Sequence, residues 1–166
     1  MESYLQSLYD NDVLLIAAAG NDGSSYYSYP ASYESVISVA SIEQNKARSS
    51  YSQYNDQVEL SAPGGSVWST VPGNTYSRKS GTSMATPHVA GVAGLLRMAF
   101  PKCSSKQIRM VMAYTAKDLD VKGCDVRTDF GLVQANRAFK LLKKNCGELK
   151  GNPVGGCYKL KKKNKS

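Results

Sequence analysis

A continuous apolar run at residues 13–20 (VLLIAAAG) constrains the fold of this chain more than any other segment. Strands buried on both faces of a parallel sheet have such runs, whereas strands with one exposed face alternate between apolar and polar residues. The run is the longest apolar stretch and is far shorter than the roughly 18 residues of a membrane span. It therefore predicts a strand that is buried in a parallel sheet and ends at Gly20.

The other segments indicate strands that interleave with helices. Further strands are predicted where β-branched residues cluster, at residues 35–42, 57–63 and 66–72. Helices are predicted where apolar residues recur at helical spacing, at residues 2–10, 82–100, 104–114 and 133–142. Ser104 is the predicted N-cap of the third helix, and the second is small or apolar nearly all round, which indicates burial. The class is therefore α/β, with a mostly parallel sheet flanked by helices.

The formal net charge of +8 is concentrated at the C-terminal end. Residues 140–166 contain nine lysines and one acid, Glu148, whereas residues 1–139 carry 12 basic and 12 acidic residues. This distribution is typical of a solvated terminus, and a patch for a polyanion or a membrane surface is the alternative. Because the rest of the chain is balanced, we expect no nucleic-acid partner.

The four cysteines, Cys103, Cys124, Cys146 and Cys157, all lie in the last 40% of the chain. None forms a C-x-x-C pair, so we expect no zinc site. An even number permits two disulfides in three connectivities; we favour Cys103–Cys124 and Cys146–Cys157, with four free thiols as the alternative. Disulfides suit a secretory compartment, but the N-terminus has no signal-peptide pattern. This combination is a first indication that an N-terminal part is missing.

Ser83 lies in the first turn of the predicted helix at residues 82–100, which Gly81 or Thr82 caps. Free backbone N–H groups at a helix start can stabilise an oxyanion while a hydroxyl there attacks a carbonyl. A serine-capped core helix explains the same residues without catalysis. His88, the only histidine, lies five residues later and about 140° around the helix, so it is not the expected base. We expect His88 to be buried and hydrogen-bonded.

The segment SGTSMATPHVAGVAGLL (80–96) resembles the active-serine segment of the subtilisin-like serine proteases, the subtilases. VLLIAAAGNDG resembles the family strand that ends in the oxyanion asparagine, and YPASYESVISVASI resembles the loop and strand after it. ELSAPGGSVWSTVPGNTY and FGLVQANRAF also match. The resemblance covers about residues 5–142 and implies part of a subtilisin-like three-layer fold. Residues 1–142 would form the C-terminal part of the peptidase domain, and residues 143–166 a basic, cysteine-containing tail.

The resemblance also implies roles for individual residues. Ser83 would be the nucleophile, and Asn21 would donate its side-chain amide to the oxyanion together with the Ser83 N–H. Without the family, Asn21 is part of an ordinary turn after a strand. One wall of the first specificity pocket would be formed by the small residues Ala17, Ala18, Ala19 and Gly20. Tyr29-Pro30 matches a position where the family often has a cis peptide.

The chemistry that the resemblance implies needs no cofactor. Many subtilases bind structural calcium, so the resemblance leaves such a site possible, but no acidic cluster here has convincing ligand spacing and we assign no metal ligand. A solvated loop is the expected setting of the four C-terminal aspartates Asp118, Asp120, Asp125 and Asp129.

The acid and base of a subtilase triad are not found in the chain. The triad runs Asp, His, Ser, but only 20 residues precede Asn21, and His88 is the sole histidine. We favour a C-terminal fragment of a secreted endopeptidase that acts on proteins or peptides. The alternatives are a non-catalytic pseudoprotease or peptide-binding remnant, and one chain of an enzyme whose separate N-terminal half brings Asp and His. We expect the isolated chain to be poorly folded and nearly inactive.

Overall fold

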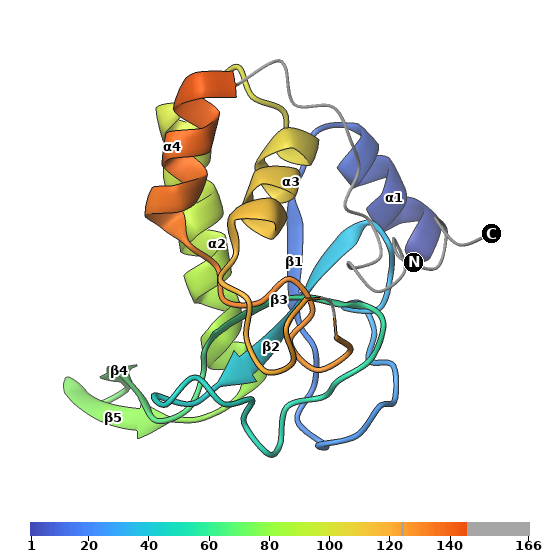
Figure 1. The fold of residues 1–166 in the computed structure, drawn as a ribbon. Coiled ribbons are helices and arrows are strands. Elements are labelled where there is room, and N and C mark those ends of the chain that lie inside the picture. Colours follow the sequence, from blue (N-terminus) through green and yellow to red (C-terminus); the bar gives the residue numbers. More distant parts are fainter. Residues whose placement is uncertain (124, 146–166) are drawn as a thin grey trace.

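The computed structural model describes residues 1–123 and 125–145, and its centre is a three-stranded parallel sheet (Figure 1). The strands lie in the order β1 (Leu15–Ala18), β2 (Val36–Ile42), β3 (Val58–Pro63). A separate antiparallel hairpin is formed by β4 (Val67–Val71) and β5 (Thr75–Lys79). The helices are α1 (Glu2–Asp10), α2 (Thr82–Ala99), α3 (Ser105–Thr115) and α4 (Ala135–Asn145). The predicted α/β class is confirmed.

The middle strand β2 is the centre of the core. All seven of its residues are buried, because β1 and β3 flank it and α2 packs across all three strands. Ile37 and Val39 of β2 join Leu60 of β3 and Val89 and Leu96 of α2 in the main apolar cluster. The alternation in its sequence therefore does not give β2 an exposed face.

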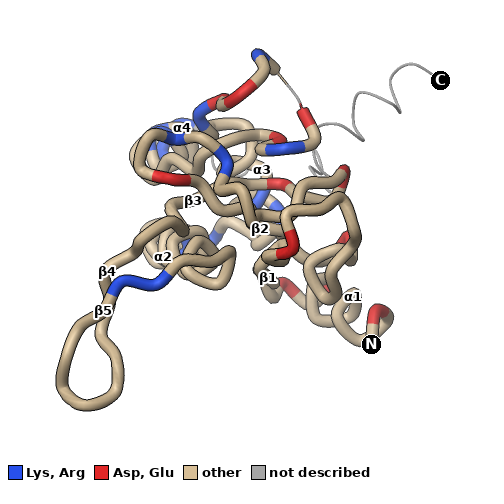
Figure 2. The backbone as a smooth tube through the Cα atoms, turned by 90° about the horizontal axis from the view of Figure 1, so that it is seen from below, with Lys and Arg blue, Asp and Glu red and all other residues tan. Residues whose placement is uncertain are grey.

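The expectation that the first apolar run is buried on both faces is wrong in this structure. All four residues of β1 are partly exposed. The reason is that β1 forms the edge of the sheet and, within the described residues, pairs only with β2. In Figures 1 and 2, β1 lies between α1 and α2, so helices stand on both of its faces although its outer edge is open.

Helix α2 is also less buried than its composition predicts. It buries a single stripe of residues at helical spacing, namely Thr82, Ala85, Val89, Ala93 and Leu96. On the opposite side Leu95 is 57% exposed and Met98 is 76% exposed. The sheet covers one face of the helix, and α3 and α4 also pack against it, but none of the described elements covers Leu95 and Met98. The outer face therefore remains apolar and open.

The hairpin was only half predicted, because β5 (TYSRK) is polar and mostly exposed. Gly73 and Asn74 both have positive φ values, 89° and 55°, which allows the chain to reverse between paired Val71 and Thr75. Figure 2 shows the hairpin extending away from the body of the molecule. Its exposed aromatic pair, Trp68 and Tyr76, stacks with centroids 6.4 Å apart.

Helix α3 begins as predicted, with Ser104 as the N-cap of a capping box that Gln107 completes. Cys103, just before it, is fully buried. The other three cysteines and most of the basic tail lie outside the described residues, so both disulfide pairings remain predictions. In the described part of the chain, no helix is long and apolar enough to cross a membrane.

Candidate active site

Ser83 lies at the start of α2, where the chain leaves the hairpin and turns into the helix. Gly81 is the N-cap, as one of the two predicted alternatives, and Ser83 is exposed in the first turn. The Gly81 carbonyl accepts hydrogen bonds from the Met84 and Ala85 N–H groups. The Ser83 N–H has no hydrogen-bond partner among the described residues. An exposed hydroxyl and a free N–H thus share one helix start, where the helix dipole favours negative charge.

Asn21 lies in the loop after β1, three residues beyond the end of that strand. Its Oδ1 accepts hydrogen bonds from both the backbone N–H and the hydroxyl of Thr82, each at 2.9 Å. Because a backbone N–H can only donate, the atom facing it is the oxygen of the amide. The Asn21 Nδ2 is therefore the outward end, and within residues 1–123 and 125–145 it has no partner. Asn21 and Ser83 each present an unused N–H donor at the same end of α2.

Thr82 connects the strand end to the helix start. Its hydroxyl donates to Asn21 and accepts a hydrogen bond from the Gly20 N–H at 3.3 Å. Residues about 60 positions apart in the chain meet here, because the carboxyl end of β1 and the N-terminus of α2 lie at one edge of the sheet. Sequence reasoning did not single out Thr82, since it gives only a helix-cap signal and its partners are distant in sequence.

The four small residues predicted to form a pocket wall lie along the end of β1. Ala17, Ala18 and Gly20 are partly exposed, whereas Ala19 is 2% exposed and packs against Ala40 and Val58. The Gly20 φ of 114° is in the region that favours glycine. Ala17, Ala18 and Gly20 thus have surface available to a ligand, and their role in substrate binding remains a prediction. The Tyr29-Pro30 peptide bond after this segment is cis, as expected.

His88 is not buried, which corrects the prediction for this residue. It is exposed on the uncovered side of α2, and its Nδ1 lies 2.9 Å from the Met84 carbonyl oxygen. The predicted hydrogen bond therefore exists, but the layer needed to bury the ring is lacking among the described residues. No hydrogen bond joins His88 to Ser83 within that part of the chain. Ser83 has no base among its described neighbours.

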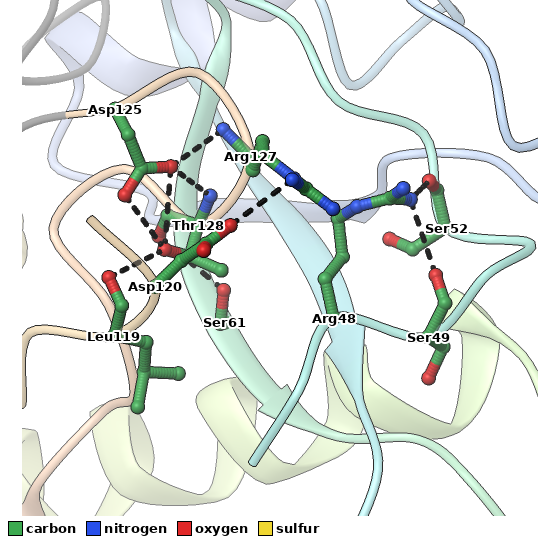
Figure 3. A network of polar contacts seen from close by, with 9 residues as sticks. All are labelled: Arg48, Ser49, Ser52, Ser61, Leu119, Asp120, Asp125, Arg127 and Thr128. Carbon is green, nitrogen blue, oxygen red and sulfur yellow. Dashed lines mark hydrogen bonds and ion pairs between the residues drawn. The ribbon is translucent and has the colours of Figure 1, made fainter.

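The aspartate-containing loop before α4 was predicted to be solvated, but internal hydrogen bonds and an ion pair hold it (Figure 3). Asp125 accepts hydrogen bonds from the backbone N–H groups of Arg127 and Thr128, at 2.7 and 2.8 Å, and Asp120 forms an ion pair with Arg127 at 3.1 Å. Asp129 is only 1% exposed, so describing all four aspartates as solvated was wrong. Within the described ranges, no group of three or more His, Cys, Asp or Glu side chains is placed to hold a metal ion.

Comparison with known proteins agrees with this geometry. A model of the subtilase family matches residues 1–131. A thermostable alkaline protease of Halalkalibacterium halodurans is 48% identical over 126 residues, which are 76% of this chain and 34% of the relative. Subtilisin BL of Lederbergia lenta is 44% identical over 140 residues, which are 84% of this chain and 51% of the relative. The chain thus spans 34–51% of the length of these relatives.

Solved structures show the same fold. The psychrophilic subtilisin-like protease Apa1 from the Antarctic psychrotroph Pseudoalteromonas sp. AS-11 superimposes with a TM-score of 0.82 at 24% identity, over 90% of this chain and 68% of that one. The prenylagaramide maturation protease PagA superimposes with a TM-score of 0.77 at 30% identity, over 85% of this chain and 54% of that one. The fold is that of subtilisin-like serine proteases. The chain belongs to the subtilase family.

Proposed function

We propose that this chain is the serine-bearing part of a secreted subtilisin-like endopeptidase that hydrolyses protein or peptide substrates. The observation that carries the proposal is the Asn21–Thr82 contact. Two hydrogen bonds fix the Asn21 oxygen and leave its Nδ2 free beside the helix start that carries Ser83. A fixed amide donor and a backbone N–H near a nucleophile are the components of an oxyanion hole. The relatives named above supply the class of reaction.

In this mechanism the Ser83 hydroxyl attacks the substrate carbonyl carbon and gives its proton to a base that the described residues do not contain. The carbonyl oxygen becomes an oxyanion, which accepts hydrogen bonds from Asn21 Nδ2 and the Ser83 N–H. Collapse of this intermediate breaks the C–N bond, and the amine leaves with the proton. Water then hydrolyses the Ser83 ester by the same steps. Acyl transfer of this kind needs no cofactor.

The acid and base would come from an N-terminal half, either in the same polypeptide or as a separate chain. The surface available to such a half is the open edge of β1 and the exposed face of α2. A cavity of about 300 Å³ lies between them, lined by Leu14, Ile16, Ala90 and Gly94 among others. An added parallel strand would satisfy the β1 edge, and other elements of that half would cover Leu95 and Met98 on the outer face of α2. This surface therefore favours a catalytic assembly over a stand-alone binding module.

Reconstitution tests the proposal. The purified chain is mixed with the N-terminal half of a relative such as subtilisin BL, and cleavage of a fluorogenic peptide is measured. We expect little cleavage by either part, clear cleavage by the mixture, and none with Ser83→Ala. Ser83-dependent cleavage by the isolated chain would contradict the need for an outside base. A stable complex without cleavage, and without fluorophosphonate labelling of Ser83, would favour the alternative of a non-catalytic peptide-binding remnant.

A further inference from the structure

Gln53, in the loop between β2 and β3, is a buried polar side chain that neither the family resemblance nor the site described above assigns. It is 1% exposed, although glutamine is usually a surface residue. Its Oε1 accepts a hydrogen bond from the Asp22 N–H at 3.1 Å. Its Nε2 donates to the Tyr26 carbonyl at 3.1 Å and to the Ser28 hydroxyl at 2.7 Å. Both ends of the amide are therefore used on the loop that follows β1.

These contacts restrain the main chain on both sides of Asn21. The Gln53 backbone N–H donates to the Gly20 carbonyl at 3.0 Å, so the residue before Asn21 is held as well as Asp22 after it. Thr82 holds the Asn21 side chain from the opposite direction. Asn21 is thus fixed through its backbone neighbours by Gln53 and through its side-chain oxygen by Thr82.

The Gln53 amide and the conformation of Gly20 depend on each other. A Cβ atom at Gly20 would lie 2.1 Å from Gln53 Oε1 and 2.7 Å from the Ser28 hydroxyl, which is impossible without displacing them. The amide therefore occupies the space that the missing side chain leaves. Since Gly20 comes directly before Asn21, a displaced amide would change where Asn21 points.

We propose that Gln53 is a positioning residue for the Asn21 amide, a role that rests on the proposed function. An oxyanion donor is effective only when it is held in place before the charge develops. A shift of about 1 Å in a reacting group can cost about 10²-fold in rate. Gln53 never reaches the substrate in this arrangement; it acts through Gly20 and Asp22.

A nuclear magnetic resonance measurement on the ¹⁵N-labelled chain, bound to the unlabelled N-terminal half used for reconstitution, tests the positioning role without any turnover. Gln53→Met keeps the length of the side chain and removes its hydrogen bonds. Gln57→Met is the matched control, because Gln57 is 9% exposed and its side chain forms no hydrogen bond with residues 20–28. We expect the signals of the Asn21 side-chain amide to move from their wild-type positions in Gln53→Met only. Unchanged Asn21 signals in Gln53→Met would overturn the proposal.

Gln53→Glu decides the question if Gln53→Met does not fold. Its carboxyl oxygen can still accept the Asp22 N–H, but a carboxylate cannot donate to the Tyr26 carbonyl. Signals of Asn21 near their wild-type positions, with shifted backbone signals at Tyr26 and Ser28, support the proposal. Asn21 signals that resemble those of a free asparagine, while the Asp22 backbone N–H signal stays at its wild-type position, would overturn it.

Kinetics of the reconstituted enzyme separate positioning from a general structural role. Gln53→Met should lower kcat about tenfold with little change in KM, and lower it less than about twofold when Asn21→Ala is already present. Equal losses in both backgrounds would show that Gln53 does not act through Asn21. If the enzyme with Gln53 intact is inactive, the proposed function fails, while the Asn21 amide signals still decide the role of Gln53.

Discussion

The ion pair between Glu59 of β3 and Arg109 of α3 provides the sharpest test of how this fold is held together. Both side chains are 1% exposed. The Arg109 Nε lies 2.9 and 3.0 Å from the two Glu59 oxygens, and its Nη2 lies 2.5 Å from one of them. Arg109 also donates to the Glu34 and Val36 carbonyls. Burial lowers the pKa of Arg109, but the charge and hydrogen bonds of Glu59 outweigh it and leave that pKa above its ordinary value.

Glu59→Leu removes the carboxylate and leaves the guanidinium buried without its counter-charge. Loss of one partner of a buried pair costs about 3–5 kcal/mol, out of a total stability of about 5–15 kcal/mol for a domain. With an m-value of about 2 kcal/mol per M urea, the unfolding midpoint should fall by about 2 M. The double variant Glu59→Leu, Arg109→Met removes both charges and should recover most of this loss.

The measurement is urea unfolding followed by far-ultraviolet circular dichroism for wild type, both single variants and the double variant. The expected order of midpoints is wild type, then the double variant, then the singles. A Glu59→Leu variant that loses less than about 1 kcal/mol would show that the buried charge is solvated in some other way. A double variant no more stable than the singles would refute charge burial as the cause.

Three further predictions concern the active site, pH and the uncovered face. Asn21→Ala should lower kcat of the reconstituted enzyme about 10²–10³-fold, the loss already established for the oxyanion asparagine of subtilisin; an unchanged kcat would contradict its assigned role. Burial raises the pKa of Asp12, but the Ser105 N–H and Arg97 outweigh it, so that pKa lies below its usual 3.8. The ionised Asp12 carboxylate therefore stabilises the fold above its usual pKa, and this stabilisation is lost as pH falls through the lower pKa of the folded state. The loss of stability below about pH 4 should be shallower in Asp12→Asn than in wild type. Urea midpoints that depend on pH in the same way in both proteins would contradict this role of Asp12. Leu95→Lys should change stability by less than about 0.5 kcal/mol but reduce aggregation measured by light scattering; a large fall in the urea midpoint would mean that Leu95 is covered.

The sequence predicted the segments whose signals are local. The N-cap at Ser104, the strand at 35–42 and the family segment around Ser83 depend on neighbouring residues, and the structure places the corresponding elements there. It did not predict Thr82 or Gln53 as partners of the Asn21 loop. Those contacts join residues 25 or more positions apart, and a single polar residue in a loop gives no signal of its distant partner.

Three of the incorrect predictions have one physical cause. An apolar pattern predicts that a segment is buried, but it does not predict which residues pack against that segment. Patterns of burial occur in the run at 13–20, on the outer face of α2 and around His88. His88, that outer face and all of the run except Ala19 are at least partly exposed in the described chain. The family segments pointed to Asn21 and Ser83, and the structure places both at one end of α2, but their catalytic roles remain predictions. The source of the base was not predictable, because the described residues place no base beside Ser83.

The exposed hairpin has a consequence for spectroscopy. Trp68 is the only tryptophan in the chain, and it is 62% exposed on β4 beside Tyr76 and Arg78. Its fluorescence therefore reports the surroundings of the hairpin rather than the melting of the core, and it is a poor probe of global unfolding. The same property makes it an intrinsic optical sensor: a blue shift of Trp68 emission on mixing with a second polypeptide would signal that the hairpin has become covered.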